Sequence, residues 1–246
     1  MTVNGEWTAA RRAVIRDALG IGVATGAYGL SFGAISTAAG LSVAQTCALS
    51  ALMFSGASQF ALVGVLASGG GVATAAATAA LLGSRNALYG LRLAGLLRVP
   101  GPRRLVAAHL VIDESTAMAV GRDNERAGRL GFRATGLSVL VLWNLGTLLG
   151  TLGARALDDP RVLGFDAAVP AAFLALLAPR MRRRRLATAV LASCGPRAAR
   201  TQAPWAIALG AAAVALVAAP FLPAGVPVLL AAVAAAVLAL RLDASS

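Results

Sequence analysis

The sequence has few ionisable side chains for its length, and this scarcity excludes an ordinary soluble protein. Only 13% of the 246 residues are charged, about half the share of a typical soluble domain, and lysine is absent. From Ala18 to Ser84 there is no Asp, Glu, Lys, Arg or His at all. Because roughly 20 apolar residues suffice to cross a bilayer, this stretch predicts several membrane spans.

Cysteine and histidine are also scarce, which argues against several kinds of chemistry. Cys47 and Cys194 lie far apart in the sequence, so they form neither a disulfide framework nor a metal-binding spacing. His109 is the single histidine, and no HExxH motif is present, so a metal site is not expected. No GxxxxGK[ST] motif appears either, which argues against ATP-driven transport by this chain. The sequence therefore indicates no cofactor.

Hydrophobic residues make up 58% of the chain, and they predict an all-α fold, a polytopic transmembrane helix bundle. About seven or eight spans are expected, with re-entrant or discontinuous helices allowed. Residues 1–17 are predicted to be a cytoplasmic segment, 18–240 a single transmembrane domain and 241–246 a tail. Whether 72–97 and 186–194 cross is left open. The apolar runs are 18–39, 43–67, 72–97, 105–121, 132–153, 164–178, 204–220 and 225–240.

The net charge of +12 arises from 22 arginines against 10 acidic residues, and most of the arginines fall in short clusters between the apolar runs. This distribution favours contact with a lipid bilayer and its anionic headgroups over contact with nucleic acid. With eight crossings and both termini inside, fifteen arginines lie inside and five outside, which fits an inner (cell) membrane protein with cytoplasmic termini. The cluster at 98–104 falls outside and fits poorly, so a re-entrant third segment is the alternative.

Small and neutral polar residues recur along three of the runs. In the first run, glycines spaced by four, three and four share one helix face, which indicates either close helix packing or a flexible face that unwinds for a substrate. The second run places Ser55 and Gln59 four apart on one face, and the fifth carries Trp143 and Asn144. Either interhelical hydrogen bonds or a lined cavity would explain them. The glycines are Gly22, Gly26, Gly29 and Gly33.

Ionisable residues inside the third and fourth runs are the principal candidates for a functional site. Arg85 lies mid-segment beside Asn86, and it requires an internal partner. In the fourth run, His109 and Asp113 are four apart and so share a helix face, with Glu114 turned by about 100°. One alternative is a buried ion pair with Arg85 that only sets helix register. The other is a substrate- or proton-handling site, the usual role of ionisable groups within membranes.

Together these residues resemble the AzlC family, which includes the large subunits of bacterial branched-chain amino-acid exporters. The resemblance covers about residues 16–179. It implies export of branched-chain or related amino acids together with a small membrane partner of the AzlD type. The matching stretches are GAYGLSFGAISTAAGLS, LMFSGASQFALVG, RNALYGLRLAGLL, HLVIDES, VLWNLGTLLGTLGA and LGFDAAVPAAFLALL.

We therefore expect a gradient-driven exporter of small neutral amino acids and not an enzyme. Arg85 would hold the substrate carboxylate by a two-pronged contact, and Asp113 or Glu114 would hold its ammonium. The other carboxylate could then carry a proton, because two like charges this close favour protonation of one. The competing hypotheses are a membrane enzyme that uses His109 and the two carboxylates, and a membrane scaffold without transport activity.

Overall fold

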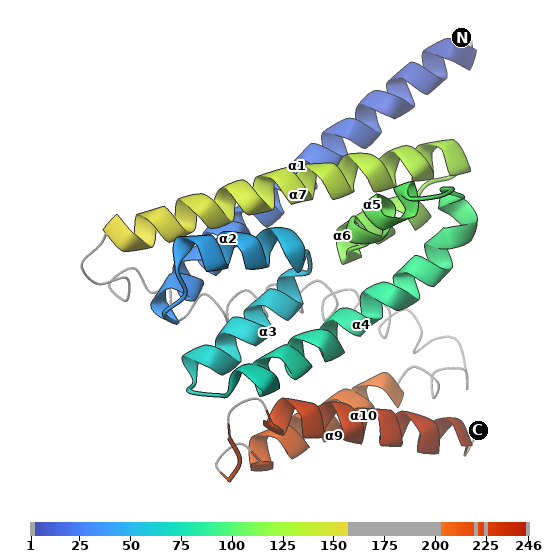
Figure 1. The fold of residues 1–246 in the computed structure, drawn as a ribbon. Coiled ribbons are helices and arrows are strands. Elements are labelled where there is room, and N and C mark those ends of the chain that lie inside the picture. Colours follow the sequence, from blue (N-terminus) through green and yellow to red (C-terminus); the bar gives the residue numbers. More distant parts are fainter. Residues whose placement is uncertain (1–2, 157–202, 219–220, 224–225, 245–246) are drawn as a thin grey trace, which may run out of the picture. The chain divides into compact units, whose positions relative to one another are not determined.

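The computed structural model describes residues 3–156, 203–218, 221–223 and 226–244, and all the regular elements within them are helices. The predicted all-α fold is confirmed. Segments 164–178 and 186–194 lie outside the described residues. The helices are α1 (Val3–Ala38), α2 (Val43–Leu52), α3 (Gly56–Ala67), α4 (Val72–Leu97), α5 (Arg103–His109), α6 (Asp113–Val120), α7 (Glu125–Ala156), α9 (Ala203–Ala218) and α10 (Val226–Ala244) (Figure 1).

The chain forms two compact units. The first holds residues 1–63 and 79–166, and the second holds residues 64–78 and 167–246, within which α9 packs on α10. Within the described residues, two helices are long and apolar enough to cross a membrane, over Trp7–Ala38 and Glu125–Ala156. The predicted count of seven or eight spans is not confirmed, and the single transmembrane domain over 18–240 stays a prediction.

Helices α1 and α7 pack side by side and run in the same direction (Figure 1). A methyl group added at Gly26 would meet the carbonyl oxygen of Leu142 at 2.9 Å, and one at Gly29 would meet that of Trp143 at 2.6 Å. Further along, Gly33 faces Thr147 and Gly150 of α7 faces Leu30. Residue numbers rise together along both helices, so the pair is parallel. The glycine face of the first span is thus a packing face, as one of its two interpretations predicted.

Two of the predicted spans are broken in the middle. The run 43–67 becomes α2 and α3, with Met53, Phe54 and Ser55 between them, and the run 105–121 becomes α5 and α6, with residues 110–112 between them. The ten residues of α2 and the seven of α5 measure only about 15 and 10 Å. Neither is long enough to cross the roughly 30 Å of a hydrocarbon core. The discontinuous helices allowed by the sequence are therefore present.

The α5–α6 segment leaves α7 at the same end at which it arrives. The chain comes from α4, where Arg98 pairs with Glu125 at 3.7 Å and Arg129 Nε donates to the Leu96 carbonyl at 2.8 Å. At the break, Leu110 packs on Gly136, and α6 then returns until Ala119 packs on Gly128. The segment is consequently a hairpin, and α6 is antiparallel to α7.

This hairpin corrects the predicted placement of the arginine cluster at 98–104. The expectation put it on the outer side, opposite the N-terminus. Arg98 instead lies beside Glu125 at the start of α7, and Arg126 of the same turn contacts Trp7 near the start of α1. The physical reason is that 105–121 is not one continuous helix but folds back along α7. The re-entrant alternative placed the turn in the third segment, 72–97, but that segment is the continuous helix α4. The segment that turns back is 105–121.

Candidate functional site

Gln59 holds the break between α2 and α3 in place. Its side-chain amide nitrogen donates to the Met53 carbonyl at 2.6 Å and to the Ser50 carbonyl at 3.2 Å. Its oxygen accepts from Trp143 Nε1 of α7 at 2.9 Å. The last carbonyls of a helix have no partner within the helix, so the fully buried Gln59 satisfies two of them and ties the break to α7.

Trp143 anchors this break from the other side. Its ring lies 6.1 Å from the rings of both Phe32 and Phe60, and those two rings are 5.6 Å apart. Aromatic rings at such separations attract one another beyond simple area burial. Asn144 on the next residue donates instead to the Leu140 carbonyl of its own helix at 2.8 Å. Of the predicted pair on the fifth span, only Trp143 reaches the first break.

Ser55 lies within the break and not on a helix face with Gln59, which corrects the expected geometry. Its hydroxyl is 3.1 Å from that of Ser58, and both side chains are buried. The i to i+4 relation requires a continuous helix, and the backbone turns at Met53, where the Ser55 N–H bonds the Met53 carbonyl at 2.6 Å. Ser58 also lies close to Gly83 of α4.

The second break is held by a residue that the sequence did not single out. The Ser115 hydroxyl donates to the Leu110 carbonyl at 2.6 Å and accepts from the Ile112 N–H at 3.1 Å. Serine side chains commonly satisfy the backbone where a helix starts. The sequence signal that could have identified Ser115 is its position directly after the two acidic residues of the DES motif, Asp113 and Glu114. His109 is the last residue of α5 and Asp113 is the first residue of α6. The prediction that the two share a helix face is therefore wrong.

The two breaks meet. The Phe54 ring of the first break and the His109 ring at the edge of the second have centroids 5.6 Å apart. In Figure 1 the α2–α3 turn lies beside the α5–α6 turn. Phe54 is buried, whereas His109 is exposed. Irregular backbone from two broken runs therefore comes together at one place, with the long helix α4 alongside.

At this place the expected ion pair has formed. Arg85 Nη2 of α4 lies 2.7 Å from Asp113 Oδ2, at the first residue of α6. The side chains are 35% and 33% exposed, so the pair is partly accessible. Glu114 is half-buried next to it and makes no ion pair with another described residue. The structure thus brings Arg85, Asp113 and Glu114 together.

Several polar atoms around the ion pair are buried without a hydrogen-bond partner. They are a donor, Arg85 Nε; an acceptor, Asn86 Oδ1; and the hydroxyl of Thr116, three residues beyond Asp113 on α6. Buried polar atoms usually have a hydrogen-bond partner, so these three atoms have bonding capacity that a polar ligand could use; Ser36, Thr46, Thr135 and Ser138 have such atoms too. Elsewhere in the described residues, no group of three His, Cys, Asp or Glu side chains gathers to hold a metal ion.

The family assignment follows from comparison with known proteins. The AzlC protein family matches residues 20–157, which is more than half of the chain and includes both broken helices. The chain belongs to this family. It is also similar to the inner membrane protein YgaZ of Escherichia coli (strain K12), with 28% identity over 180 residues that cover 69% of this chain and 73% of YgaZ. No solved structure matches.

The protein is accordingly a membrane protein with a permease-like role, as the family, the relative and the apolar helices agree. The predicted family resemblance is confirmed.

Proposed function

We propose that this chain is the large subunit of a two-component, gradient-driven exporter of branched-chain or other small neutral amino acids. Its partner would be a small membrane subunit of the AzlD type. The main support is one observation: the Arg85–Asp113 ion pair, with Glu114 beside it, lies where two broken helices meet. The termini would be cytoplasmic.

An amino-acid zwitterion suits this ion pair because its two charges are complementary to the two side chains. When the substrate enters, its carboxylate takes the guanidinium of Arg85 and its ammonium takes the carboxylate of Asp113. One ion pair is replaced by two, so neither side chain loses a charged partner when the substrate binds. A substrate with only one charge would break the pair and leave one side chain uncompensated.

The unpartnered atoms fit the same ligand. Arg85 Nε is a free donor in the guanidinium fork, which is the geometry that binds a carboxylate by two parallel hydrogen bonds. Asn86 Oδ1 is a free acceptor on the neighbouring residue, suited to an ammonium N–H. Glu114, which has no ion-pair partner among the described residues, is the group left to carry a proton.

The hairpin arrangement supports a transport cycle. The α5–α6 hairpin approaches the ion pair from the end of α7 that carries Glu125. Helix α2 approaches from the opposite end, since Ser50 bonds Thr147 and Gly56 packs on Trp143 further back along α7. Transporters with discontinuous helices bind substrate at such breaks and open to alternate sides by moving one element against another.

The test is efflux from cells that lack their own branched-chain exporter and express this chain with its candidate small partner. Preloaded labelled leucine, isoleucine and valine should leave faster than from cells with an empty vector. Leucinol, which lacks the carboxylate, and 4-methylpentanoate, which lacks the ammonium, should compete poorly with leucine. Equal competition by either analogue would contradict the two-charge site, and no efflux of any neutral amino acid would contradict the function.

A further inference from the structure

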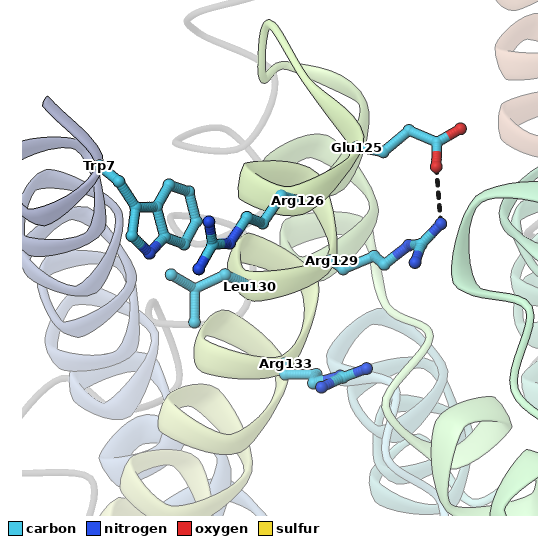
Figure 2. Close-up of a pocket in the computed structure, with 6 residues that line it drawn as sticks. All are labelled: Trp7, Glu125, Arg126, Arg129, Leu130 and Arg133. Atoms are coloured by element: carbon cyan, nitrogen blue, oxygen red, sulfur yellow. Dashed lines mark hydrogen bonds and ion pairs between the residues drawn. The ribbon is translucent and has the colours of Figure 1, made fainter. Parts of the chain in front are cut away.

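An arginine-lined cavity lies at the start of α7, where none of the residues of the Arg85–Asp113 pair contributes to its lining. Its volume is about 420 Å³, and it opens between the first turns of α7 and the N-terminal part of α1. Figure 2 shows Arg126 and Leu130 extending from α7 toward Trp7 of α1, whereas Arg129 and Arg133 extend from the same stretch of α7 in the opposite direction. The lining residues are Trp7, Glu125, Arg126, Arg129, Leu130 and Arg133.

The cavity carries an excess of positive charge. Glu125 is the one carboxylate among the lining residues, and it already forms two ion pairs. Its Oε2 lies 2.6 Å from Arg129 Nη2, and its Oε1 lies 3.7 Å from Arg98 Nη2. Arg126 lies flat over the Trp7 ring, 3.9 Å from its centroid, which fixes the guanidinium in place. Neither Arg126 nor Arg133 forms an ion pair within the described residues. Both guanidinium groups therefore lack a carboxylate partner there, and both residues line the cavity although their side chains extend in different directions (Figure 2).

The cavity lies at the level where the membrane surface is expected. Gly26 packs on Leu142 and Gly29 on Trp143, so the same register brings Arg133 near the level of Asp17. Asp17 is the last ionisable residue before the uncharged stretch that starts at Ala18. Tryptophan and arginine at such a boundary are typical of the headgroup region of a bilayer.

An exposed apolar stripe continues from the cavity along α7. Leu137 and Val141 follow Arg133 at intervals of four, so they lie on the same face, and they are 52% and 60% exposed. A soluble phosphate ester has no apolar part that would contact this stripe. An acyl chain attached to a bound phosphate would lie along it. Basic pockets of this kind between membrane helices bind anionic lipid headgroups.

We propose that this cavity binds the phosphate of an anionic phospholipid. Arg126, which Trp7 holds in position, is the phosphate ligand, and the exposed Arg133 side chain turns toward the phosphate when the lipid binds. The lipid joins α1 to α7 at the membrane surface. It therefore stabilises the parallel pair on which the rest of the first unit packs. This site is independent of the proposed export function.

Lipid binding is tested on the purified, delipidated full-length chain in a neutral detergent. Phosphatidylglycerol should raise the melting temperature and remain bound in native mass spectrometry, and phosphatidylcholine should do neither. The double variant R126A/R133A should lose about twenty-five-fold in phosphatidylglycerol affinity, since each arginine near an anionic headgroup contributes about fivefold. R126K/R133K, which keeps the charge but not the fork, should lose less.

The matched control is R11A/R12A, which removes the same charge from exposed positions of α1 outside the cavity. It should bind phosphatidylglycerol as the wild type does. Equal loss in both double variants, or no loss in R126A/R133A, would overturn the site. If glycerol phosphate alone produces the full stabilisation, the ligand is a soluble phosphate ester and the lipid assignment is wrong.

Discussion

The rings of Phe54 and His109 lie 5.6 Å apart although they belong to different predicted spans. Their contact exists because both spans are interrupted, one after α2 and the other after α5. It brings the two stretches of irregular backbone to the same place as the Arg85–Asp113 pair. Irregular backbone at membrane depth is tolerated where it is buried in protein or lines a polar cavity, so this is the part of the chain best suited to hold a substrate.

The first prediction concerns the two adjacent carboxylates. Asp113→Asn and Glu114→Gln should each abolish export while membrane abundance stays near that of the wild type. Arg85 and Asp113 are each about a third exposed, so the loss of one partner leaves the other partly hydrated and the fold intact. Asp123→Asn, in the exposed loop before α7, is the control and should export normally. If both site variants vanish from the membrane, the pair is structural only.

Arginine 85 can be compared with a second arginine two turns further along α4. Arg85→Lys keeps the positive charge but loses the planar fork, so export should fall by roughly tenfold or more. Arg92→Lys changes an exposed side chain and should leave the export rate within about twofold of the wild type. His109→Ala should have a smaller effect than either carboxylate variant. Equal activity of the two lysine variants would remove Arg85 from the site.

Much of the scaffold could be predicted from the sequence, because hydropathy and glycine spacing report directly on helices. The run 72–97 matches the bounds of α4, and the four glycines of the first span do form a packing face. The pairing of Arg85 with a carboxylate of the fourth span could also be predicted, since a guanidinium within a membrane segment requires an internal partner.

The breaks could not be predicted in the same way. Residues Leu110, Val111 and Ile112 are as apolar as any membrane span, so hydropathy shows no interruption there. The determinants are hydrogen bonds from Gln59 and Ser115 to backbone carbonyls. Such bonds depend on which helix packs alongside, and that information is not local in the sequence.

The packing of α1 on α7 predicts different responses at two glycines of one helix. Gly29→Ala places a methyl group 2.6 Å from the Trp143 carbonyl oxygen, a backbone atom that cannot move away easily. Overpacking of this kind costs about 1–3 kcal/mol, and the melting temperature in detergent should fall. Gly20→Ala meets nothing within 4 Å and should change it little. Equal stability of the two variants would contradict the close α1–α7 contact.

A substitution at Gln59 tests whether this residue has a structural role or binds substrate. Gln59→Leu leaves the Ser50 carbonyl and Trp143 Nε1 without the partner that Gln59 supplies, and each such group costs about 1–3 kcal/mol when buried. The Met53 carbonyl loses one of its two donors and keeps the Ser55 N–H. The folded fraction should drop markedly, while export per folded molecule should be retained. Gln45→Ala, at the exposed start of α2, is the control and should cost about 1 kcal/mol or less. A loss of export without a loss of stability would instead place Gln59 in the binding site.

The last prediction follows from the α5–α6 hairpin and concerns the side of the membrane that each loop faces. Because Arg98 lies beside Glu125 and Arg126 beside Trp7, the loop 98–104 should face the same side as the N-terminus. Of the thirteen arginines that the structure describes in the first unit, ten then lie at this end, Arg85 and Arg92 lie within α4, and Arg155 lies at the far end of α7. By the positive-inside rule, this end is the cytoplasmic one. The ten are Arg11, Arg12, Arg16, Arg98, Arg103, Arg104, Arg122, Arg126, Arg129 and Arg133.

Cysteine labelling checks this arrangement in a chain whose Cys47 and Cys194 are changed to serine. On intact cells, a membrane-impermeant maleimide should reach Ala156→Cys but neither Arg12→Cys nor Arg103→Cys. After permeabilisation all three should react, which controls for buried thiols. Eight regular crossings make the opposite prediction for position 103, because 105–121 would then cross and leave the loop 98–104 outside. Labelling of Arg103→Cys on intact cells, with Arg12→Cys protected, would therefore exclude the hairpin and restore a spanning fourth segment.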